Sequence, residues 1–211
     1  MKSSHQAVND ALRFPLGEQF EADLTAMLQD EDSGASTVIA LIDLDSFLHI
    51  NEDFGTEAGD QMLIAMGRHL ADGLPETAKV YRIAGDQFGI IFHGDMEKEA
   101  VFLYMENVRK TFDVKAPDGE TMTISVGIAA AFDDASRYQE LFHKADSAMY
   151  RAKFNGRNMV ALAREEKMVP KTSHYSSEQL KRLTKLSKRE GIGEAVLLRE
   201  ALDMLLKKYE N

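Results

Sequence analysis

The stretch STVIALIDLD (36–45) decides the fold of this chain, because a continuous apolar run ends there in two aspartates. A short apolar run of this kind is typical of a strand that is buried on both faces of a central sheet. Asp43 and Asp45 are two residues apart, so in a strand both side chains point to the same face. The end of this strand is therefore predicted to open into a polar site.

Helical and strand-like patterns alternate on both sides of this stretch. Apolar spacing and turn residues predict a first helix over 6–30, broken near Pro15 and Gly17, and further helices over 46–55, 58–72, 96–112 and 137–154. Strands are predicted over 79–84, 87–92, 121–131 and 158–163. Gly85 and Asp86 separate two of these strands and predict a hairpin with a two-residue turn. The order of elements predicts an α+β fold, with one mostly antiparallel sheet flanked by helices.

The composition is that of a globular protein, with 211 residues, 44% hydrophobic residues and no cysteine. Disulfides and thiolate metal sites are therefore excluded. The N-terminus lacks the apolar segment of a signal peptide, and no run approaches the length of a membrane helix. We expect a cytoplasmic protein that does not contact a membrane.

Charge is unevenly distributed along the chain. The net charge is −10, but residues 164–211 hold 11 Lys and Arg against 8 Asp and Glu. The preceding part is therefore strongly acidic and the tail is mildly basic. This asymmetry suggests two modules with different partners, over 1–163 and 164–211, although a solvated charged surface would also produce it.

The hairpin tip brings a third carboxylate toward the end of the first strand. If the hairpin pairs beside that strand, Asp86 approaches Asp43 across the sheet. Two such carboxylates suit a Mg²⁺ ion that bridges nucleotide phosphates. The alternative is that Asp86 is only a turn residue, since Gly-Asp pairs are common in turns.

Three blocks of sequence together resemble the GGDEF family of bacterial diguanylate cyclases. They are DLDSFLHINEDFGTEAGD (43–60), YRIAGDQF (81–88) and ADSAMYRAKFNGRN (145–158), in the family's order and spacing. The resemblance covers about residues 9–163. It implies a fold similar to the palm of nucleotidyl cyclases and polymerases. The activity that it implies joins two GTP molecules into cyclic di-GMP where two domains meet.

The resemblance also implies roles for individual residues. Asn51 and Asp60 would hydrogen-bond the guanine edge, where one carboxylate can accept two donors, and Phe47 would lie beside the base or ribose. Lys153 and Arg157 would reach the triphosphate and offset its charge. By themselves, two such basic residues would more commonly belong to a solvated helix face.

The signature loop carries the catalytic part of the resemblance. Ala84 and Gly85 form its approach to the nucleotide, Asp86 is the residue tied to catalysis, and Asp43 and Asp86 would hold the metal, Mg²⁺ or Mn²⁺ bound with GTP. The loop reads Ala84-Gly85-Asp86-Gln87-Phe88, so Ala84 replaces a glycine and Gln87 replaces an acidic residue. An amide is a weak ligand for a hard cation, so we expect a domain that binds a guanine nucleotide with weak or absent turnover.

Two other functions stay open. The first is an active diguanylate cyclase that makes cyclic di-GMP from two GTP molecules, and the second is an interaction scaffold that binds no nucleotide. The favoured interpretation is a dimeric signalling or transcription regulator with a degenerate signature loop.

The C-terminal segment 168–211 reads as a strand, a helix, a turn and a second helix. Its two apolar faces cannot be buried within so short a segment, so a partner is needed. The spacing resembles the ribbon-helix-helix family of DNA-binding dimers. The resemblance implies a homodimer, with Thr172 and His174 facing DNA and the helix start near Gly193 facing a phosphate. A helical hairpin that serves only dimerisation is the alternative.

Overall fold

The computed structural model describes residues 4–29, 37–94, 96–164, 172–190 and 193–209. The chain divides into two compact units, Met1–Glu166 and Lys167–Asn211.

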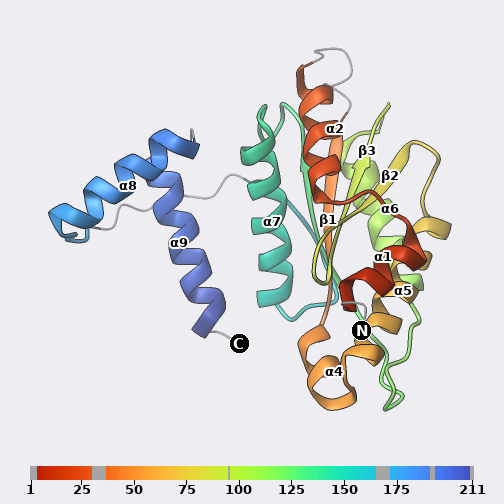
Figure 1. Cartoon of the computed structure of the whole chain (residues 1–211). Coiled ribbons are helices and arrows are strands. Elements are labelled where there is room, and N and C mark those ends of the chain that lie inside the picture. Colours follow the sequence, from red (N-terminus) through yellow and green to blue (C-terminus); the bar gives the residue numbers. More distant parts are fainter. Residues whose placement is uncertain (1–3, 30–36, 95, 165–171, 191–192, 210–211) are drawn as a thin grey trace. The chain divides into compact units, whose positions relative to one another are not determined.

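The first unit is built on a five-stranded sheet in the order β2-β3-β1-β4-β5 (Figure 1). Its strands are β1 (Val38–Leu44), β2 (Ala78–Ala84), β3 (Gln87–Phe92), β4 (Ile124–Ala130) and β5 (Val160–Leu162). Neighbouring strands run antiparallel except β4 and β5, which are parallel. The mostly antiparallel α+β sheet predicted from the sequence is confirmed, with the apolar run of β1 at its centre.

Helices cover both faces of this sheet (Figure 1). They are α1 (Ser4–Leu12), α2 (Gly17–Gln29), α4 (Phe47–Phe54), α5 (Thr56–Gly73), α6 (Lys98–Thr111) and α7 (Tyr138–Phe154). The predicted break near Pro15 and Gly17 separates α1 from α2. The other predicted helices agree with the observed ones to within a few residues.

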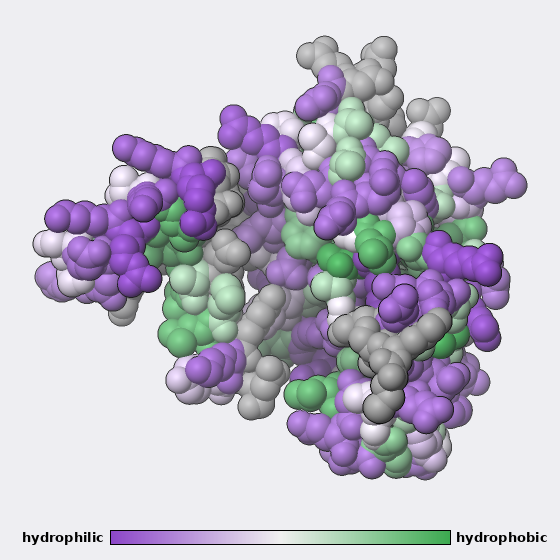
Figure 2. Space-filling model, viewed as in Figure 1, coloured by the Kyte–Doolittle hydropathy of each residue, from purple (hydrophilic) through white to green (hydrophobic). Residues whose placement is uncertain are grey.

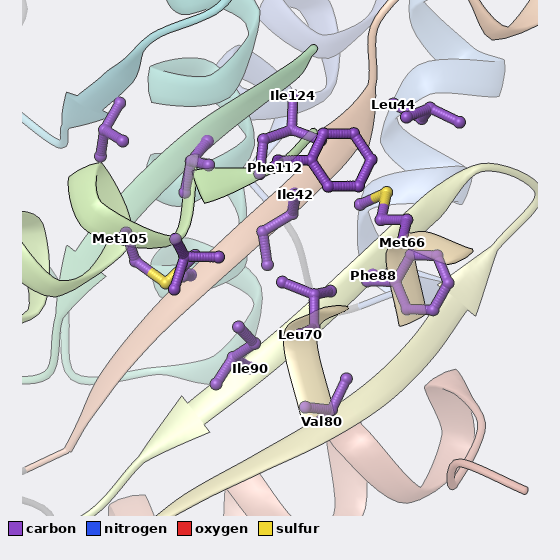
Figure 3. Packing of buried hydrophobic residues seen from close by; sticks show 14 of the residues in the cluster. Ile42, Leu44, Met66, Leu70, Val80, Phe88, Ile90, Met105, Phe112 and Ile124 are labelled. Carbon is purple, nitrogen blue, oxygen red and sulfur yellow. The ribbon is translucent and has the colours of Figure 1, made fainter. Parts of the chain in front are cut away.

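Alternation along β1 divides the core into two layers. Even-numbered residues such as Ile42 join α5 and α6 in one apolar cluster, while odd-numbered residues such as Leu41 join α2 and α7 in the other. Figure 3 shows the first layer, where Leu70 and Met66 of α5 lie near Phe88 of β3. All seven residues of β1 are buried, which is why its sequence is apolar without alternation.

A glycine in β4 lets α7 lie close against the sheet. A Cβ atom at Gly127 would lie 2.1 Å from the carbonyl oxygen of Ala145 and 2.3 Å from the backbone nitrogen of Met149. These are backbone atoms of α7 and cannot move aside separately. The missing side chain at Gly127 thus sets the distance between α7 and the sheet, and with it the position of basic residues at the end of α7.

The segment between α1 and α2 closes one edge of the sheet. The backbone nitrogen of Arg82 in β2 donates to the carbonyl oxygen of Pro15 at 2.9 Å, and Leu16 forms a parallel bridge with Arg82. The close approach needs Gly17, where a Cβ would lie 3.0 Å from the carbonyl oxygen of Ile83. The edge strand β2 is therefore partly covered by the chain's own proline-containing segment.

The second unit contains α8 (Ser177–Glu190) and α9 (Glu194–Tyr209). Ser176 caps α8, because the backbone nitrogen of Gln179 donates to its Oγ at 3.2 Å and its own nitrogen donates to Oε1 of Gln179 at 2.9 Å. Oγ1 of Thr184 donates to Oε1 of Glu194 at 2.6 Å and ties the two helices together.

The strand predicted before α8 is absent from the part of that segment which the structure describes. Residues 172–176 have no regular secondary structure, and the rest of that prediction, from 168 to 171, lies outside the described residues. A ribbon of the expected kind pairs with the strand of a second chain, so one chain cannot form its ladder. Among the described helices, none combines the length and apolar character that crossing a bilayer requires.

Candidate functional site

The polar site predicted at the end of β1 lies opposite the tip of the β2–β3 hairpin. Asp43 of β1 pairs in register with Gln87 of β3 on one side and Ser125 of β4 on the other. Gly85 and Asp86 form the two-residue turn that was predicted. Because Asp86 directly precedes Gln87, which is in register with Asp43, the two carboxylates lie at the same end of the sheet, and the charge of Asp86 raises the pKa of Asp43.

Asp45, the second aspartate of this strand end, accepts hydrogen bonds on both of its carboxylate oxygens. It is 3% exposed, and its carboxylate accepts from Oγ1 of Thr123 at 2.8 Å, Oγ of Ser125 at 2.7 Å and the backbone nitrogen of Asn158 at 3.0 Å. These donors use most of its acceptor capacity. Asp45 therefore holds β4 and the turn after α7 together, and is an anchor of the site rather than a free ligand.

Asp43 has the opposite surroundings. Its Oδ1 has no well-directed hydrogen bond and instead contacts Nζ of Lys153 at 2.5 Å. Burial raises the pKa of Asp43 to about 7, the Lys153 ammonium opposes this rise, and the charges of Asp86 and Asp45 add to it. Two predicted site residues, Asp43 and Lys153, thus contact each other. The single ammonium group of Lys153 does not fully compensate the buried negative charge of Asp43.

Gln87 is engaged in a contact of its own. Nε2 of Gln87 donates to Oδ1 of Asp146 in α7 at 3.5 Å, a long hydrogen bond. A carboxylate at position 87 would add negative charge near Asp146, Asp43 and Asp86, where Lys153 is already paired with Asp43, and a bound cation would offset that charge. The neutral amide therefore makes this end of the site compatible with an absence of metal.

Arg82 was not predicted as a site residue, although it connects two parts of the site. It is 4% exposed, and its Nη2 donates to the carbonyl oxygen of Gly85 at 2.6 Å while Nη1 donates to Oδ1 of Asn9 at 3.3 Å. Burial lowers the pKa of Arg82, and the charges of Asp60 and Asp86 oppose this change. Arg82 thus links α1 to the hairpin tip, and the charge of Asp60 in α5 also acts on it. A basic residue within the apolar run KVYRIA was the sequence signal for it.

Three residues predicted to recognise guanine gather where α4 meets α5. A Cβ at Gly59 would lie 2.0 Å from Oδ1 of Asn51 and 3.0 Å from Cε2 of Phe47, so both side chains pack over this glycine. Asp60 is the next residue, and Asp60, Asn51 and Phe47 are all partly exposed. The structure therefore places the Phe47 ring and the Asn51 amide together over Gly59, at an accessible place, and Asp60 directly follows that glycine in α5.

The turn after α7 carries Arg157 in an uncommon backbone conformation. Gly156, Arg157 and Asn158 have φ of 116°, 63° and 48°. Left-handed φ is costly for residues other than glycine, and such strain tends to be kept at functional sites. Arg157 is exposed, whereas Lys153, one helical turn earlier, reaches inward to Asp43.

The hairpin tip accommodates the substitution of its first glycine. Gly85 has a φ of 51°, which favours glycine, whereas Ala84 lies outside the positive-φ region and is exposed. The Ala84 methyl group therefore adds no backbone strain to the turn.

Metal coordination by this chain would depend on few ligands. Within the described part of the chain, no group of three or more His, Asp or Glu side chains is arranged to hold an ion. The Asp43 and Asp86 pair fits Mg²⁺ only where phosphates and water supply the other ligands, which is the usual arrangement for this ion. The buried Asp43 carboxylate, whose charge is only partly compensated by Lys153, fits a site in which the protein and the nucleotide both supply ligands to the ion.

The residues predicted to face DNA are exposed in the second unit. Thr172 and His174 precede α8, and Gly193 precedes α9, where its carbonyl oxygen accepts from the nitrogen of Leu197 at 3.2 Å. Gly193 thus begins the first turn of α9, as expected.

Comparison with known proteins agrees with both units. Residues 17–159 match the family "Diguanylate cyclase, GGDEF domain", and residues 169–210 match the "Ribbon-helix-helix domain". The crystal structure of the GGDEF domain of YfiN (TpbB) from Pseudomonas aeruginosa superposes with a TM-score of 0.67 and 28% identity, covering 74% of this chain and 99% of that domain.

Two curated relatives are similar in sequence over the first unit. The probable diguanylate cyclase DgcC of Escherichia coli is 32% identical over 127 residues, 59% of this chain and 34% of DgcC. The cyclic di-GMP phosphodiesterase NbdA of Pseudomonas aeruginosa is 30% identical over 148 residues, 69% of this chain and 19% of NbdA. The matched regions cover 34% of DgcC and 19% of NbdA, so the chain spans only part of the length of these two relatives. With the family matched over most of its first unit, the chain belongs to the GGDEF family and continues into a ribbon-helix-helix segment.

Proposed function

We propose that the first unit binds a guanine nucleotide, GTP or a cyclic di-GMP-related molecule, and converts GTP to cyclic di-GMP slowly or not at all. The observation that carries the proposal is the contrast within the site. Phe47 and Asn51 pack over Gly59 beside Asp60, a group that we infer receives the base, whereas Nε2 of Gln87, at the proposed metal end, donates to Oδ1 of Asp146. The GGDEF relatives are diguanylate cyclases and cyclic di-GMP signalling proteins, which supports the nucleotide class.

In the bound state each residue would have a distinct task. Asn51 and the Asp60 carboxylate would receive the hydrogen-bond donors of the guanine edge, and Phe47 would cover the base or ribose. Lys153 would exchange its contact with Asp43 for the triphosphate, while Arg157 would approach from the turn after α7. Asp43 and Asp86 would hold Mg²⁺ or Mn²⁺ with phosphate oxygens, and the ion would offset phosphate charge.

Titration calorimetry of the full chain with GTP and Mg²⁺ tests the binding proposal. Replacing Asp60 by Ala should weaken GTP binding at least about tenfold, because the paired donors of guanine lose their acceptor. Glu57→Ala is the matched control, since Glu57 is an exposed acidic residue on the same helix. Failure of the wild-type chain to bind GTP, or equal losses in both variants, would contradict the proposal.

Active diguanylate cyclase is the second candidate, favoured by the register of β1 and β3, which puts Asp43 and Asp86 at the same end of the sheet. Chromatography of products after incubation with GTP and Mg²⁺ separates the two proposals. Rapid formation of cyclic di-GMP that is lost in the Asp86→Asn variant would establish an active cyclase. It would refute the proposal that the altered signature loop makes turnover slow or absent.

The second unit is proposed to form a homodimer that contacts DNA. Apolar side chains on one stripe of α9 are exposed, namely Leu202 (54%), Leu205 (51%), Leu206 (39%) and Tyr209 (73%). Figure 2 shows apolar residues on the surface of this unit. Two helices cannot cover such a stripe themselves, so a second copy of the unit would do so, as in ribbon-helix-helix proteins.

Sedimentation of a Leu205→Glu variant tests the dimer, and Met204→Glu is its control. Met204 is 65% exposed but lies on the opposite side of α9 from the stripe. Leu205→Glu should give monomers where Met204→Glu leaves dimers. DNA binding, measured by gel shift at several salt concentrations, should weaken with salt and with loss of the dimer. Replacing Thr172 and His174 by Ala should weaken DNA binding of the dimer relative to the wild type.

A further inference from the structure

The turn after α7 is held from helix α6, whose residues take no part in the proposed binding of nucleotide. We propose that Arg109 is a positioning residue that holds Asn158 and thereby fixes the turn that presents Arg157 to the triphosphate. The inference rests on the proposed function, since it assigns a task to the phosphate end of that site.

Arg109 is itself oriented before it reaches the turn. Its side chain is 14% exposed, and Nε and Nη2 donate to Oε1 and Oε2 of Glu106 at 3.0 and 2.9 Å. This two-point contact fixes the plane of the guanidinium group. The remaining Nη1 is then aimed at Oδ1 of Asn158, to which it donates at 2.7 Å.

Asn158 is held on its other side by the anchor of the site. Its backbone nitrogen donates to Oδ2 of Asp45 at 3.0 Å, and its φ is 48°. Asparagine tolerates left-handed backbone better than most residues, but Arg157 before it, with a φ of 63°, has no such advantage. The strained conformation of Arg157 persists only if its neighbours are fixed, and Arg109 and Asp45 supply two contacts that fix Asn158.

Amide hydrogen exchange of the full chain tests the contact without any ligand. In Arg109→Gln, the amides of 156–158 should exchange about tenfold faster, as expected when a charge-assisted hydrogen bond to the turn is lost. Lys110→Gln is the matched control: Lys110 also pairs with Glu106, at 3.3 Å, but its side chain is 66% exposed and is not bonded to Asn158. Equal exchange in the two variants would overturn the inference.

Calorimetry with GTP–Mg²⁺ and with guanosine then tests whether the turn serves phosphate binding. Arg109→Gln should weaken GTP binding about fivefold and leave guanosine affinity unchanged, because only the phosphate end is disturbed. Equal losses for both ligands, or no loss, would reduce Arg109 to a structural residue. If the wild-type chain binds no GTP, the proposed function fails together with the phosphate role, while hydrogen exchange still decides whether Arg109 holds the turn.

Asn158→Gly provides a second variant that keeps the fold of the turn. Glycine accepts the left-handed φ and retains the backbone bond to Asp45, so only the acceptor of Arg109 is removed. It should show the same selective loss of GTP affinity, and combining it with Arg109→Gln should add little. Additive losses would show that the two residues act separately and would contradict the proposal.

Discussion

Two halves of the candidate site start from the same strand end and have opposite surroundings. In the anchored half, Asp45 is surrounded by the donors of Thr123, Ser125 and Asn158. The charged half consists of Asp43, Asp86, Gln87 and Lys153, and there burial raises the pKa of a carboxylate that has one ammonium group as its neighbour.

The difference shows which polar residues serve the scaffold and which are left for a ligand. A buried carboxylate that accepts hydrogen bonds from the protein stabilises the fold. A buried carboxylate whose negative charge is not fully compensated destabilises the fold until a cation, free or bound to phosphate, binds beside it. Residue type alone cannot separate these roles, because both residues are aspartates of one strand.

The largest expected effect comes from disturbing the close packing of α7 on β4, which positions Lys153 in the charged half. Gly127→Ala would place a methyl group against the backbone of α7, so α7 and Lys153 must move away from β4. We expect the free energy of unfolding in urea to fall by about 3 kcal/mol or more. GTP affinity should fall with it.

Gly193→Ala is the matched control for that variant. A Cβ at Gly193 meets no atom of the described residues within 4 Å, so its stability should change by less than about 0.5 kcal/mol. Similar losses in both variants would show that glycine content, rather than the fit of α7, matters.

The comparison between the two aspartates themselves predicts the next effect. Asp45→Ala should lower the free energy of unfolding by about 2–3 kcal/mol, because it leaves two hydroxyl groups and a backbone N–H without their acceptor. Asp43→Asn should cost less than about 1 kcal/mol or even stabilise the apo protein, since it removes a buried charge. Urea unfolding of both variants without metal measures these free energies. A larger loss in Asp43→Asn than in Asp45→Ala would contradict the prediction.

A third carboxylate, Asp23, extends the comparison to the pH dependence of stability. Asp23 in α2 accepts from Lys79 at 2.7 Å and from Tyr81 at 2.6 Å, and these bonds lower its pKa from 3.8 to about 2. Because the folded pKa is the lower one, its stabilisation is present above about pH 4 and is lost as the pH falls toward 2. We expect a loss on the order of 1 kcal/mol across this range, absent in Asp23→Asn. Parallel pH profiles of unfolding for the two proteins would contradict this.

The smallest effect concerns Gln87, one of the two residues that distinguish this loop from its family. Gln87→Glu adds a negative charge to the charged half, so without Mg²⁺ its melting temperature should fall by a few degrees, on the order of 1 kcal/mol. Mg²⁺ should then raise the melting temperature of this variant more than that of the wild type. Gln87→Met, which has similar length and no charge, should show no gain, and an equal response in all three would exclude a metal site here.

Much of the fold was predictable because its local patterns are strong. The apolar run of β1, the glycine-aspartate turn and the helical spacing of α5 and α7 each point to one structure, and the sheet followed from their order. Pairing of β1 with the hairpin also brought Asp43 and Asp86 together as expected.

The contacts that distinguish residues within the site were not predictable in the same way. Arg82 meets Asn9 across 73 positions of sequence, and Arg109 meets Asn158 across 49. Such partners are set by tertiary packing, which leaves no periodic signal. The difference between Asp43 and Asp45 was likewise hidden, since it depends on donors from β4 and from the turn after α7.

The contact between Pro15 and Arg82 at the edge of the sheet has a consequence for assembly. An uncovered edge strand offers its backbone to any other extended chain and promotes fibre growth. Here the segment before α2 occupies part of that edge, and proline has no N–H with which to recruit a further strand. Shortening the chain before α2 would therefore expose a surface prone to aggregation, so recombinant fragments should begin upstream of α1.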